Sequence, residues 1–416
     1  MKLVFRVSDL PKMLIYALAF SLTFYYPGFH LASIIINIPL VLVLLLDLVI
    51  ILKWRFNQKN LFLIILFFLW SLLGVVFRYP VLSYLPSLVF SMCLILPLGV
   101  SWKTLNIDIE KMLNYMVLGA FISFFFIPFE LYFRYMHLFG YVGNELWLNI
   151  SGHSVRLFRS SALMMEPSHF SVLLTLIYVT LDIAESRGYI IKHIILFRYC
   201  FFISLILSVS LSGIVLNILY YSVKFIRFVF LSIEKDFRIL INRRILIYSV
   251  TGIIFLLVIN VLSNNYIGHI AKKVYDRVKE TTDVVEKQKS VGSSGERASF
   301  IWASKIYLHN SSVQNVIIGD GFSNYHQWLA ANSKRIGYST GEVYNLYFVV
   351  LLSVGLLGLL FFVLMILSLT DTNYLDFGDI AFLIILLASF LTHGYLIMYW
   401  VWVPILLFKL TKKERV

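Results

Sequence analysis

Long apolar segments account for most of this chain, and one long polar segment, about residues 263–341, interrupts them. Hydrophobic residues make up 60% of the 416 residues and charged residues only 14%, whereas soluble domains are nearer half apolar and a quarter charged. Many apolar runs reach the roughly 20 residues that a helix needs to cross a bilayer. Because an open sheet or a lone strand cannot satisfy its backbone in lipid, the spans should be helices. The sequence therefore predicts an all-α polytopic integral membrane protein.

We predict about twelve transmembrane helices. They are expected at 12–27, 31–52, 61–78, 81–101, 111–133, 162–182, 194–210, 212–231, 245–262, 342–368, 379–393 and 396–410. The first segment has no small-residue cleavage site, so we interpret it as a retained span. The chain then divides into helices 1–5 (1–133), an outer loop (134–161), helices 6–9 (162–262), a large outer loop domain (263–341), and helices 10–12 with a basic tail (342–416).

Lysine and arginine residues in the short loops predict the orientation. With twelve spans the basic clusters all fall on one side of the membrane, at 2–12, 53–59, 103–111, 187–192, 224–244 and 409–415. Because basic short loops stay in the cytoplasm, we expect both termini there and the two larger loops outside. Asp371–Asp379 is an acidic exception on the cytoplasmic side, although acidic residues weigh little in this rule.

The long outer loop is expected to be ordered. Val274, Val278 and Val285 recur at helical spacing among charged residues, which is typical of a surface amphipathic helix over 271–289. The Gly/Ser stretch that follows, 291–295, predicts a hinge. A second helix is expected from 296 to 308. For most lysines of the loop the simplest interpretation is a solvated face.

The shorter outer loop ends in the first group of residues that could carry chemistry. Arg156 and Arg159 precede Glu166, and His169 follows one helical turn later. Pro167 suits the first turn of the sixth span, which puts Glu166 near its N-cap. There a carboxylate complements the helix dipole, so Glu166 is either a capping group or a functional one, as ionisable groups near a membrane often are. One Glu-x-x-His pair supplies too few ligands for a metal, and we expect none.

A second group lies in the large outer loop. Arg297 follows the Ser-Gly pair at 294–295, and an arginine grips phosphate through its planar fork. Further along, Gly319 and Gly321 flank an aspartate, and glycines let a backbone approach a ligand closely. The alternative interpretation is a simple turn and a surface arginine.

A third group marks the point where the chain enters the membrane again. Glu342 is followed by Tyr344 and Asn345, and a Gly-x-x-Gly pair, Gly355 and Gly358, comes ten residues later. Glu342 is either an N-cap carboxylate or a base, and the sequence leaves both open. The glycine pair is more typical of close helix packing.

These motifs, in this order, resemble those of the Wzy-type O-antigen and capsule repeat-unit polymerases, which share a superfamily with the O-antigen ligases. The resemblance covers nearly the whole chain, with a moderate outer loop before span six and a large one before span ten. The local matches are Arg159–Ser171 with its Glu-Pro-Ser-His-Phe-Ser core, Gly295-Glu-Arg297, Gly319-x-Gly321, and Tyr344-Asn345 followed by Gly355-x-x-Gly358. The ligases have His-Asn where this chain has Tyr344-Asn345, and Ser-Arg where it has Ser210-Leu211, which favours a polymerase.

The resemblance implies a fold similar to the C-type membrane glycosyltransferases (GT-C) and a glycosyl transfer that needs neither metal nor cofactor. The donor would be a glycan on undecaprenyl pyrophosphate, and the acceptor would be the non-reducing end of another lipid-linked repeat unit. The product would be O-antigen or capsular polysaccharide, made at the outer face of a bacterial inner membrane. Membrane lipid and a chain-length regulator are the further partners implied, and nucleic acid is not.

The resemblance also implies roles for individual residues. Charge develops on the leaving pyrophosphate, so fixed cations should stabilise the transition state. The candidates are Arg156, Arg159 and Arg297. Further candidates for binding the pyrophosphate or the glycan are Gly319, Gly321, Tyr344 and Asn345. The acceptor hydroxyl needs a general base within hydrogen-bond reach, for which the candidates are, in order, Glu166, His169 and Glu342.

Three other functions remain open from the sequence. A ligase would transfer the glycan to the lipid A-core, but the missing histidine counts against it. A transporter, such as a flippase for the same lipid, usually shows internal repeats and broken helices at mid-membrane, and the two halves of this chain show no similarity. A scaffold without chemistry would leave the clustered arginines unexplained.

Overall fold

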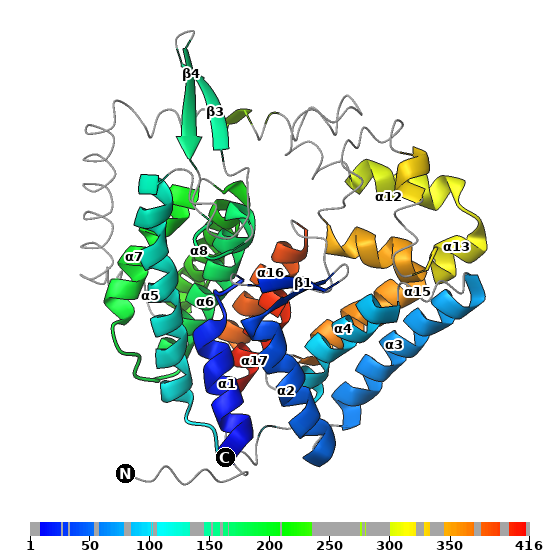
Figure 1. Cartoon of the computed structure of the whole chain (residues 1–416), viewed down its shortest axis with the longest axis horizontal. Coiled ribbons are helices and arrows are strands. Elements are labelled where there is room, and N and C mark those ends of the chain that lie inside the picture. Colours follow the sequence, from blue (N-terminus) through cyan, green and yellow to red (C-terminus); the bar gives the residue numbers. More distant parts are fainter. Residues whose placement is uncertain are drawn as a thin grey trace.

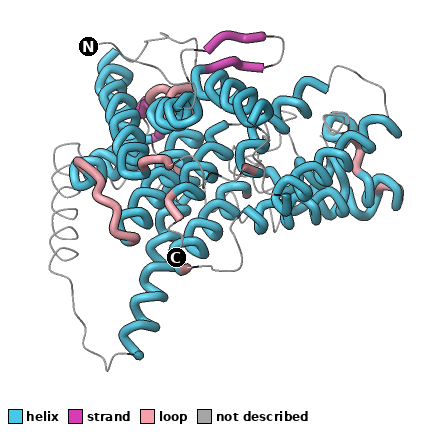
Figure 2. Tube along the Cα trace, turned by 90° about the horizontal axis from the view of Figure 1, so that it is seen from below, coloured by secondary structure: helices cyan, strands magenta, loops and turns pink. Residues whose placement is uncertain are grey.

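The chain folds into a bundle of helices (Figure 1). The computed structural model describes residues 9–25, 28–31, 34–53, 58–78, 85–100, 102, 106–133, 145–150, 153–158, 161–164, 166–208, 210–234, 275–276, 279, 300–321, 328–332, 345–369, 376–391 and 399–412. Within these ranges helix predominates, as expected from the apolar runs (Figure 2).

The helices follow the apolar segments of the sequence. Their bounds are α1 Leu10–Ser21, α2 Ile38–Lys53, α3 Gln58–Arg78, α4 Leu85–Ile95, the 3-10 turn Leu96–Gly99, α5 Ile109–Phe133, α6 Pro167–Ser186, α7 Ile194–Ser208, α8 Leu211–Glu234, α12 Phe300–Asn310, α13 Val313–Ile318, α15 Leu346–Leu369, α16 Phe377–Phe390 and α17 Tyr399–Leu410. The span predicted at 245–262 and most of the amphipathic helix predicted at 271–289 lie outside the described residues.

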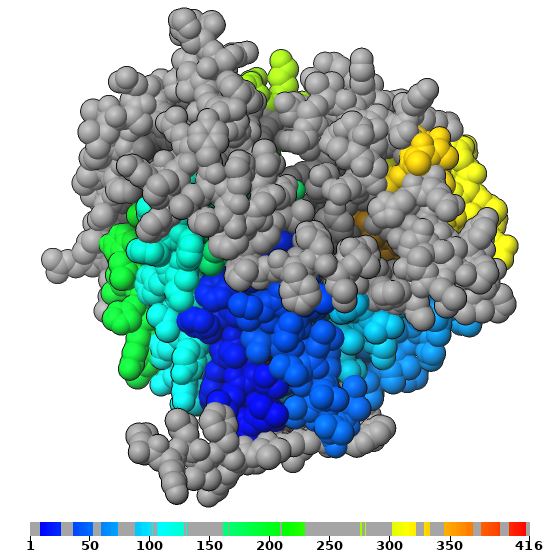
Figure 3. All heavy atoms as spheres, in the orientation of Figure 1, coloured from blue at the N-terminus to red at the C-terminus, as the bar shows by residue number. Residues whose placement is uncertain are grey.

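Four of the described helices are long and apolar enough to cross a membrane. The qualifying segments are Ile109–Pro128, Pro167–Ser186, Leu211–Phe228 and Leu346–Ser368. The other apolar helices among the described residues are shorter. Helices on the outside of the bundle leave large apolar side chains exposed, such as Leu48 of α2 (56% exposed) and Phe125 of α5 (64%), and α1, α2 and α5 cover one lateral side of the molecule (Figure 3). The fold is that of a mostly helical membrane protein.

Helix α6 lies at the centre of the bundle. Its whole apolar window is buried, whereas only 28% of the corresponding window of α8 is. A helix that is apolar on all sides is expected to be buried on all sides, and α6 packs against α7, α8, α16 and α17. Its threonines do not disturb this core, because the Thr175 and Thr180 hydroxyls donate to the carbonyls one turn earlier.

Two antiparallel hairpins, which the sequence did not predict, accompany the helices. In the first, β1 (Gly28–Leu31) pairs with β2 (Ile34–Asn37). The predicted second span started at 31, but α2 starts only at Ile38, because the Asn37 side chain caps it by accepting a hydrogen bond from the Leu40 N–H at 3.1 Å. In the second, β3 (Glu145–Ile150) pairs with β4 (His153–Phe158) and projects beyond the helices (Figure 1).

Candidate functional site

Glu166 stands directly before the central helix, as the sequence predicted. It occupies the N-cap position with an extended backbone (φ −137°, ψ 151°), and Pro167 fills the first turn. Its carboxylate makes no capping hydrogen bond to the backbone of α6. Instead Oε2 accepts from the Ser168 hydroxyl at 2.9 Å. The position is that of a cap, but the hydrogen bond typical of a capping side chain is not made.

His169 lies one turn further on, between α6 and α17. It is only 3% exposed, and its ring lies against the indole of Trp400, with centroids 4.8 Å apart and planes tilted by 32°. The imidazole is therefore held by packing against a neighbouring helix. Its neighbour Ser168 is also buried, so the start of α6 carries a carboxylate, a hydroxyl and an imidazole within four residues.

Glu130, near the end of α5, holds the segment that leads into α6. Its carboxylate accepts hydrogen bonds from the Ser161 N–H and hydroxyl and, at 2.8 Å, from the Ala162 N–H. Ala162 has a positive φ of 49°, a conformation that a non-glycine residue adopts only under constraint. The Tyr25 N–H donates to the next carbonyl, that of Leu163, at 3.1 Å. The segment before Glu166 is thus fixed to α5 and to the chain that follows α1.

Sequence reasoning missed Glu130. It treated the residue as part of the fifth span, although an acidic side chain within a span is itself a signal of function or of a buried partner. The partners, Ser161 and Ala162, could not be read from the sequence because they follow a separate loop.

Asn345 lies at the start of α15 and is fully buried. Its Oδ1 accepts from the Phe348 N–H at 2.9 Å, which caps α15, and its Nδ2 donates to the Leu391 carbonyl at 3.2 Å, just after α16. The bundle end that holds Glu166 and His169 also includes the end of α5 and the start of α17. Asn345 is hydrogen-bonded to the end of α16, and α17 begins close after α16 in the chain, so Asn345 belongs to that same end.

The arginine candidates are only partly placed. Arg156 lies in β4, opposite Trp147 of β3, and its side chain is outside the description. Arg159, Arg297, Glu342 and Tyr344 lie outside the described residues. How these groups approach Glu166 and His169 therefore stays a prediction.

Gly319 and Gly321 pack against a break in helix α15. The break is at Gly355, whose φ of 70° and ψ of −172° interrupt the helix. A Cβ on Gly355 would lie 2.2 Å from the Ile317 carbonyl oxygen, and one on Gly319 would lie 2.5 Å from the Ser353 backbone. The backbones of α13 and α15 therefore touch directly, side by side in Figure 1, and only glycine fits at the contact.

Neighbouring groups satisfy the carbonyls that the break releases. The Asp320 N–H donates to the Leu352 carbonyl at 2.7 Å, and the Gly321 N–H donates to that of Ser353 at 3.1 Å. The Trp70 indole of α3 donates to the Val354 carbonyl at 3.0 Å. Irregular backbone at membrane depth needs such partners. The backbone donors around the two glycines are thus engaged with α15 in this arrangement.

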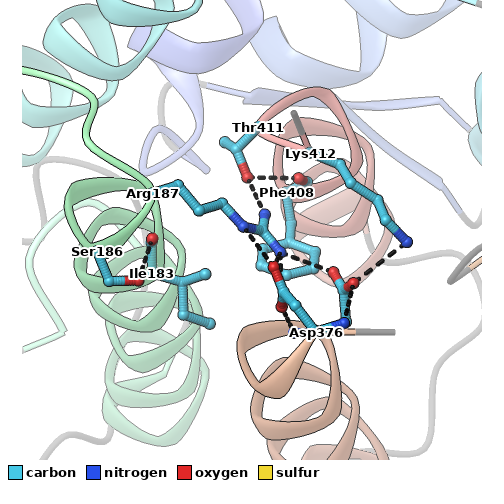
Figure 4. A network of polar contacts seen from close by, with 8 residues as sticks. Ile183, Ser186, Arg187, Asp376, Phe408, Thr411 and Lys412 are labelled. Carbon is cyan, nitrogen blue, oxygen red and sulfur yellow. Dashed lines mark hydrogen bonds and ion pairs between the residues drawn. The ribbon is translucent and has the colours of Figure 1, made fainter. Parts of the chain in front are cut away.

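The opposite end of α6 carries an ion-pair network (Figure 4). The Arg187 guanidinium donates to both oxygens of Asp376, to Asp379 at 2.8 Å, and to the Thr411 hydroxyl at 2.9 Å. Lys412 lies 3.2 Å from Asp379. Burial raises the pKa of Asp376, but the hydrogen bond from the Asp379 N–H and the charge of Arg187 together lower it by more. The pKa of Asp376 therefore lies below its usual 3.8. Two residues of the acidic loop predicted on the cytoplasmic side, Asp376 and Asp379, are thus paired with basic ones.

The described part of the site is therefore a set of polar groups at one end of a buried helix, with the ion-pair network at the other. Among the described residues, no three His, Cys, Asp or Glu side chains come together in a way that could hold a metal ion. No protein-family model matches the chain, and no curated protein matches it.

Proposed function

We propose that this protein polymerises undecaprenyl-pyrophosphate-linked oligosaccharide repeat units into O-antigen or capsular polysaccharide. In this proposal the chain crosses the bacterial inner membrane about twelve times with a GT-C-like arrangement. The end of the bundle with Glu166 and His169 faces outward. The end with Arg187 and Lys412 faces the cytoplasm, in keeping with the basic loops.

The observation that carries the proposal is the position of Glu166 and His169 at the start of a fully buried helix. The segment before them is fixed by Glu130, and the His169 ring is fixed by Trp400. Groups that act on a substrate need such fixed positions, because geometry supplies much of the rate. The termini of membrane helices are also where a lipid-linked substrate can present its sugar to water.

The chemistry would proceed by displacement of the lipid pyrophosphate. A base takes the proton of the acceptor hydroxyl, the oxygen attacks the anomeric carbon of the donor glycan, and the bond to pyrophosphate breaks. Glu166 is our first choice of base and His169 the second, because both stand at the start of α6, where a base could come within hydrogen-bond reach of the acceptor hydroxyl. The arginines at 156, 159 and 297 would stabilise the charge on the leaving group.

Replacing Glu166 by Gln tests the proposal. In a strain that depends on this chain, we expect the E166Q protein to be present in the membrane while lipid-linked single repeats accumulate and polymer is lost. A base contributes roughly two to four orders of magnitude in rate. The matched control is Glu185→Gln at the other end of α6, where the side chain is 42% exposed, and polymer should remain normal. Normal polymer in E166Q would remove Glu166 from the reaction.

The broken helix α15 favours a second candidate, a transporter of the same lipid. Transporters bind their substrates beside discontinuous helices, and α15 is interrupted at Gly355. The two functions predict different locations for the accumulated intermediate in a deletion strain. Single repeats that a glycosidase can reach from outside indicate a missing polymerase, and repeats that stay protected inside indicate a missing flippase.

A further inference from the structure

An apolar groove of about 560 Å³ runs along the outside of the bundle between α7 and α8. Phe202 and Leu205 of α7 line it, together with Ile214, Ile218, Tyr221 and Phe225 of α8. The α8 residues recur every three or four positions, so they form one stripe along the helix. Its volume is in the range of pockets that bind small molecules.

Stacked aromatic rings fix the wall of the groove before anything binds. The Tyr178 ring of α6 lies parallel to that of Phe201, with centroids 4.5 Å apart. The Phe202 ring in turn stacks on Tyr221, and the Tyr178 and Tyr221 hydroxyls share a hydrogen bond. Aromatic pairs of this kind contribute about 0.5–1.5 kcal/mol each beyond the area they bury. The groove is therefore a preformed feature of the fold.

The groove opens on the apolar outer surface of the bundle. It lies on α8, a candidate membrane span of which only 28% of the apolar window is buried. Ile218 is 61% exposed and Phe225 is 64% exposed. The amide of Asn217 instead points its nitrogen inward, donating to the Thr175 hydroxyl at 2.7 Å and to the Gly213 carbonyl at 2.8 Å. Such a surface suits a flexible hydrocarbon chain.

The end of the groove at Ile214 lies beside the first turns of α6. Gly213, which precedes the lining residue Ile214, lies so close to α6 that an added Cβ would be 2.5 Å from the Ser171 Cβ. Ser171 is five residues after Glu166, and its hydroxyl donates to the Ser168 carbonyl. A chain that leaves a headgroup near Glu166 and His169 would therefore start close to this end of the groove.

We propose that the groove between α7 and α8 binds the polyprenyl tail of the carrier lipid. The inference rests on the proposed function, because it assumes that the carrier's pyrophosphate lies near the start of α6. The inference adds where the tail lies and which residues contact it. The groove then serves as the entry path from the bilayer, and holding the tail orients the pyrophosphate at the end of the bundle.

Photolabelling of the full chain in vesicles of phosphatidylethanolamine and phosphatidylglycerol tests this proposal. The probe is undecaprenyl phosphate with a diazirine in its tail. We expect labelled peptides from α7 and α8. An excess of unlabelled undecaprenyl phosphate should reduce the label several-fold, whereas added phosphatidylglycerol should not. Equal competition by both lipids would mean that the groove holds ordinary membrane lipid, and would overturn the proposal.

Two blocking variants and a control complete the test. Ile218 and Ser222 both line the groove, so Ile218→Trp and Ser222→Trp place a bulky ring in it and should reduce its labelling several-fold. Leu48→Trp, at a similarly exposed position on α2 (56%), should label normally. If both blocking variants elute as wild type in size-exclusion chromatography and still label fully, the tail binds elsewhere.

Failure of the groove and failure of the polymerase are distinguishable. Glu166→Gln should label normally, since it leaves the groove intact. Normal polymer formation with no label in α7 or α8 would refute the groove alone. Specific labelling in a protein whose deletion leaves repeats protected inside the cell would refute the polymerase and keep the groove.

Discussion

Substitution of Gly355 by Ala should destabilise this protein more than the same substitution of Gly358, the other glycine of α15. Two effects add. The residue has a φ of 70° and a ψ of −172°, a region that is essentially restricted to glycine and costs another residue about 1–3 kcal/mol. The new Cβ would also lie 2.2 Å from the Ile317 oxygen and 2.3 Å from its carbonyl carbon. These are backbone atoms, so they can move away only if α13 moves as a whole.

The magnitude follows from what α13 would lose by moving. The hydrogen bonds from the Asp320 and Gly321 N–H groups to the Leu352 and Ser353 carbonyls would break. These bonds contribute about 0.5–1.5 kcal/mol each. Together with the backbone cost, we expect a total loss of roughly 2–6 kcal/mol. The contact between the 319–321 loop and α15 would open at the same time.

Thermal unfolding of the detergent-solubilised protein, with its abundance in the membrane, measures the effect. Gly99→Ala is the matched control, because the nearest atom to its Cβ is the flexible end of Ile64, at 3.1 Å, and no backbone atom lies closer than 3.7 Å. We expect a large drop in Tm for Gly355→Ala and little change for Gly99→Ala. Equal melting of Gly355→Ala and wild type would refute the close backbone contact and the break at this residue.

Three further outcomes are expected. Arg187→Met should lower the free energy of unfolding by about 3–5 kcal/mol, because it leaves Asp379, a side chain only 2% exposed, without its closest cation. Arg187→Lys should have a stability between those of wild type and Arg187→Met, because a lysine cannot form the same bidentate contact. Denaturant titration measures both, and an Arg187→Met protein as stable as wild type would contradict the role given to this ion pair. The folded pKa of Asp376 lies below 3.8, so its contribution to stability is complete above that pH and is lost as pH falls through the folded pKa. Melting temperatures below pH 4 should therefore decline less in Asp376→Asn than in wild type, and parallel curves would exclude Asp376 as the cause. Glu130→Gln should speed hydrogen exchange of the Ser161 and Ala162 amides by about tenfold or more, since bonds to a charged acceptor are worth about 1.5–3 kcal/mol; unchanged exchange would show that Glu130 does not hold this segment.

Local rules in the sequence determined much of the fold. The apolar runs predicted helices because a lipid environment leaves the backbone few alternatives. Pro167 predicted the start of α6, because proline suits the first turn of a helix and disrupts a helix interior. The structure confirms this start. The Gly-x-x-Gly pair at 355–358 predicted close helix packing, and the contact of Gly355 with Ile317 confirms it. For Gly319 and Gly321 the sequence predicted the approach of a ligand, which stays a prediction, and the structure places both glycines against α15.

Tertiary structure alone decided which polar groups meet. Glu130 and Ser161 are 31 positions apart, Arg187 and Asp376 are 189 apart, and Trp70 and Val354 are 284 apart. No local period relates such pairs, because their distances depend on how the helices cross and which faces they turn to one another. The break in α15 belongs to the same class. Gly355 permits it, but only the packing of α13 and the Trp70 indole supplies the partners that its released carbonyls require.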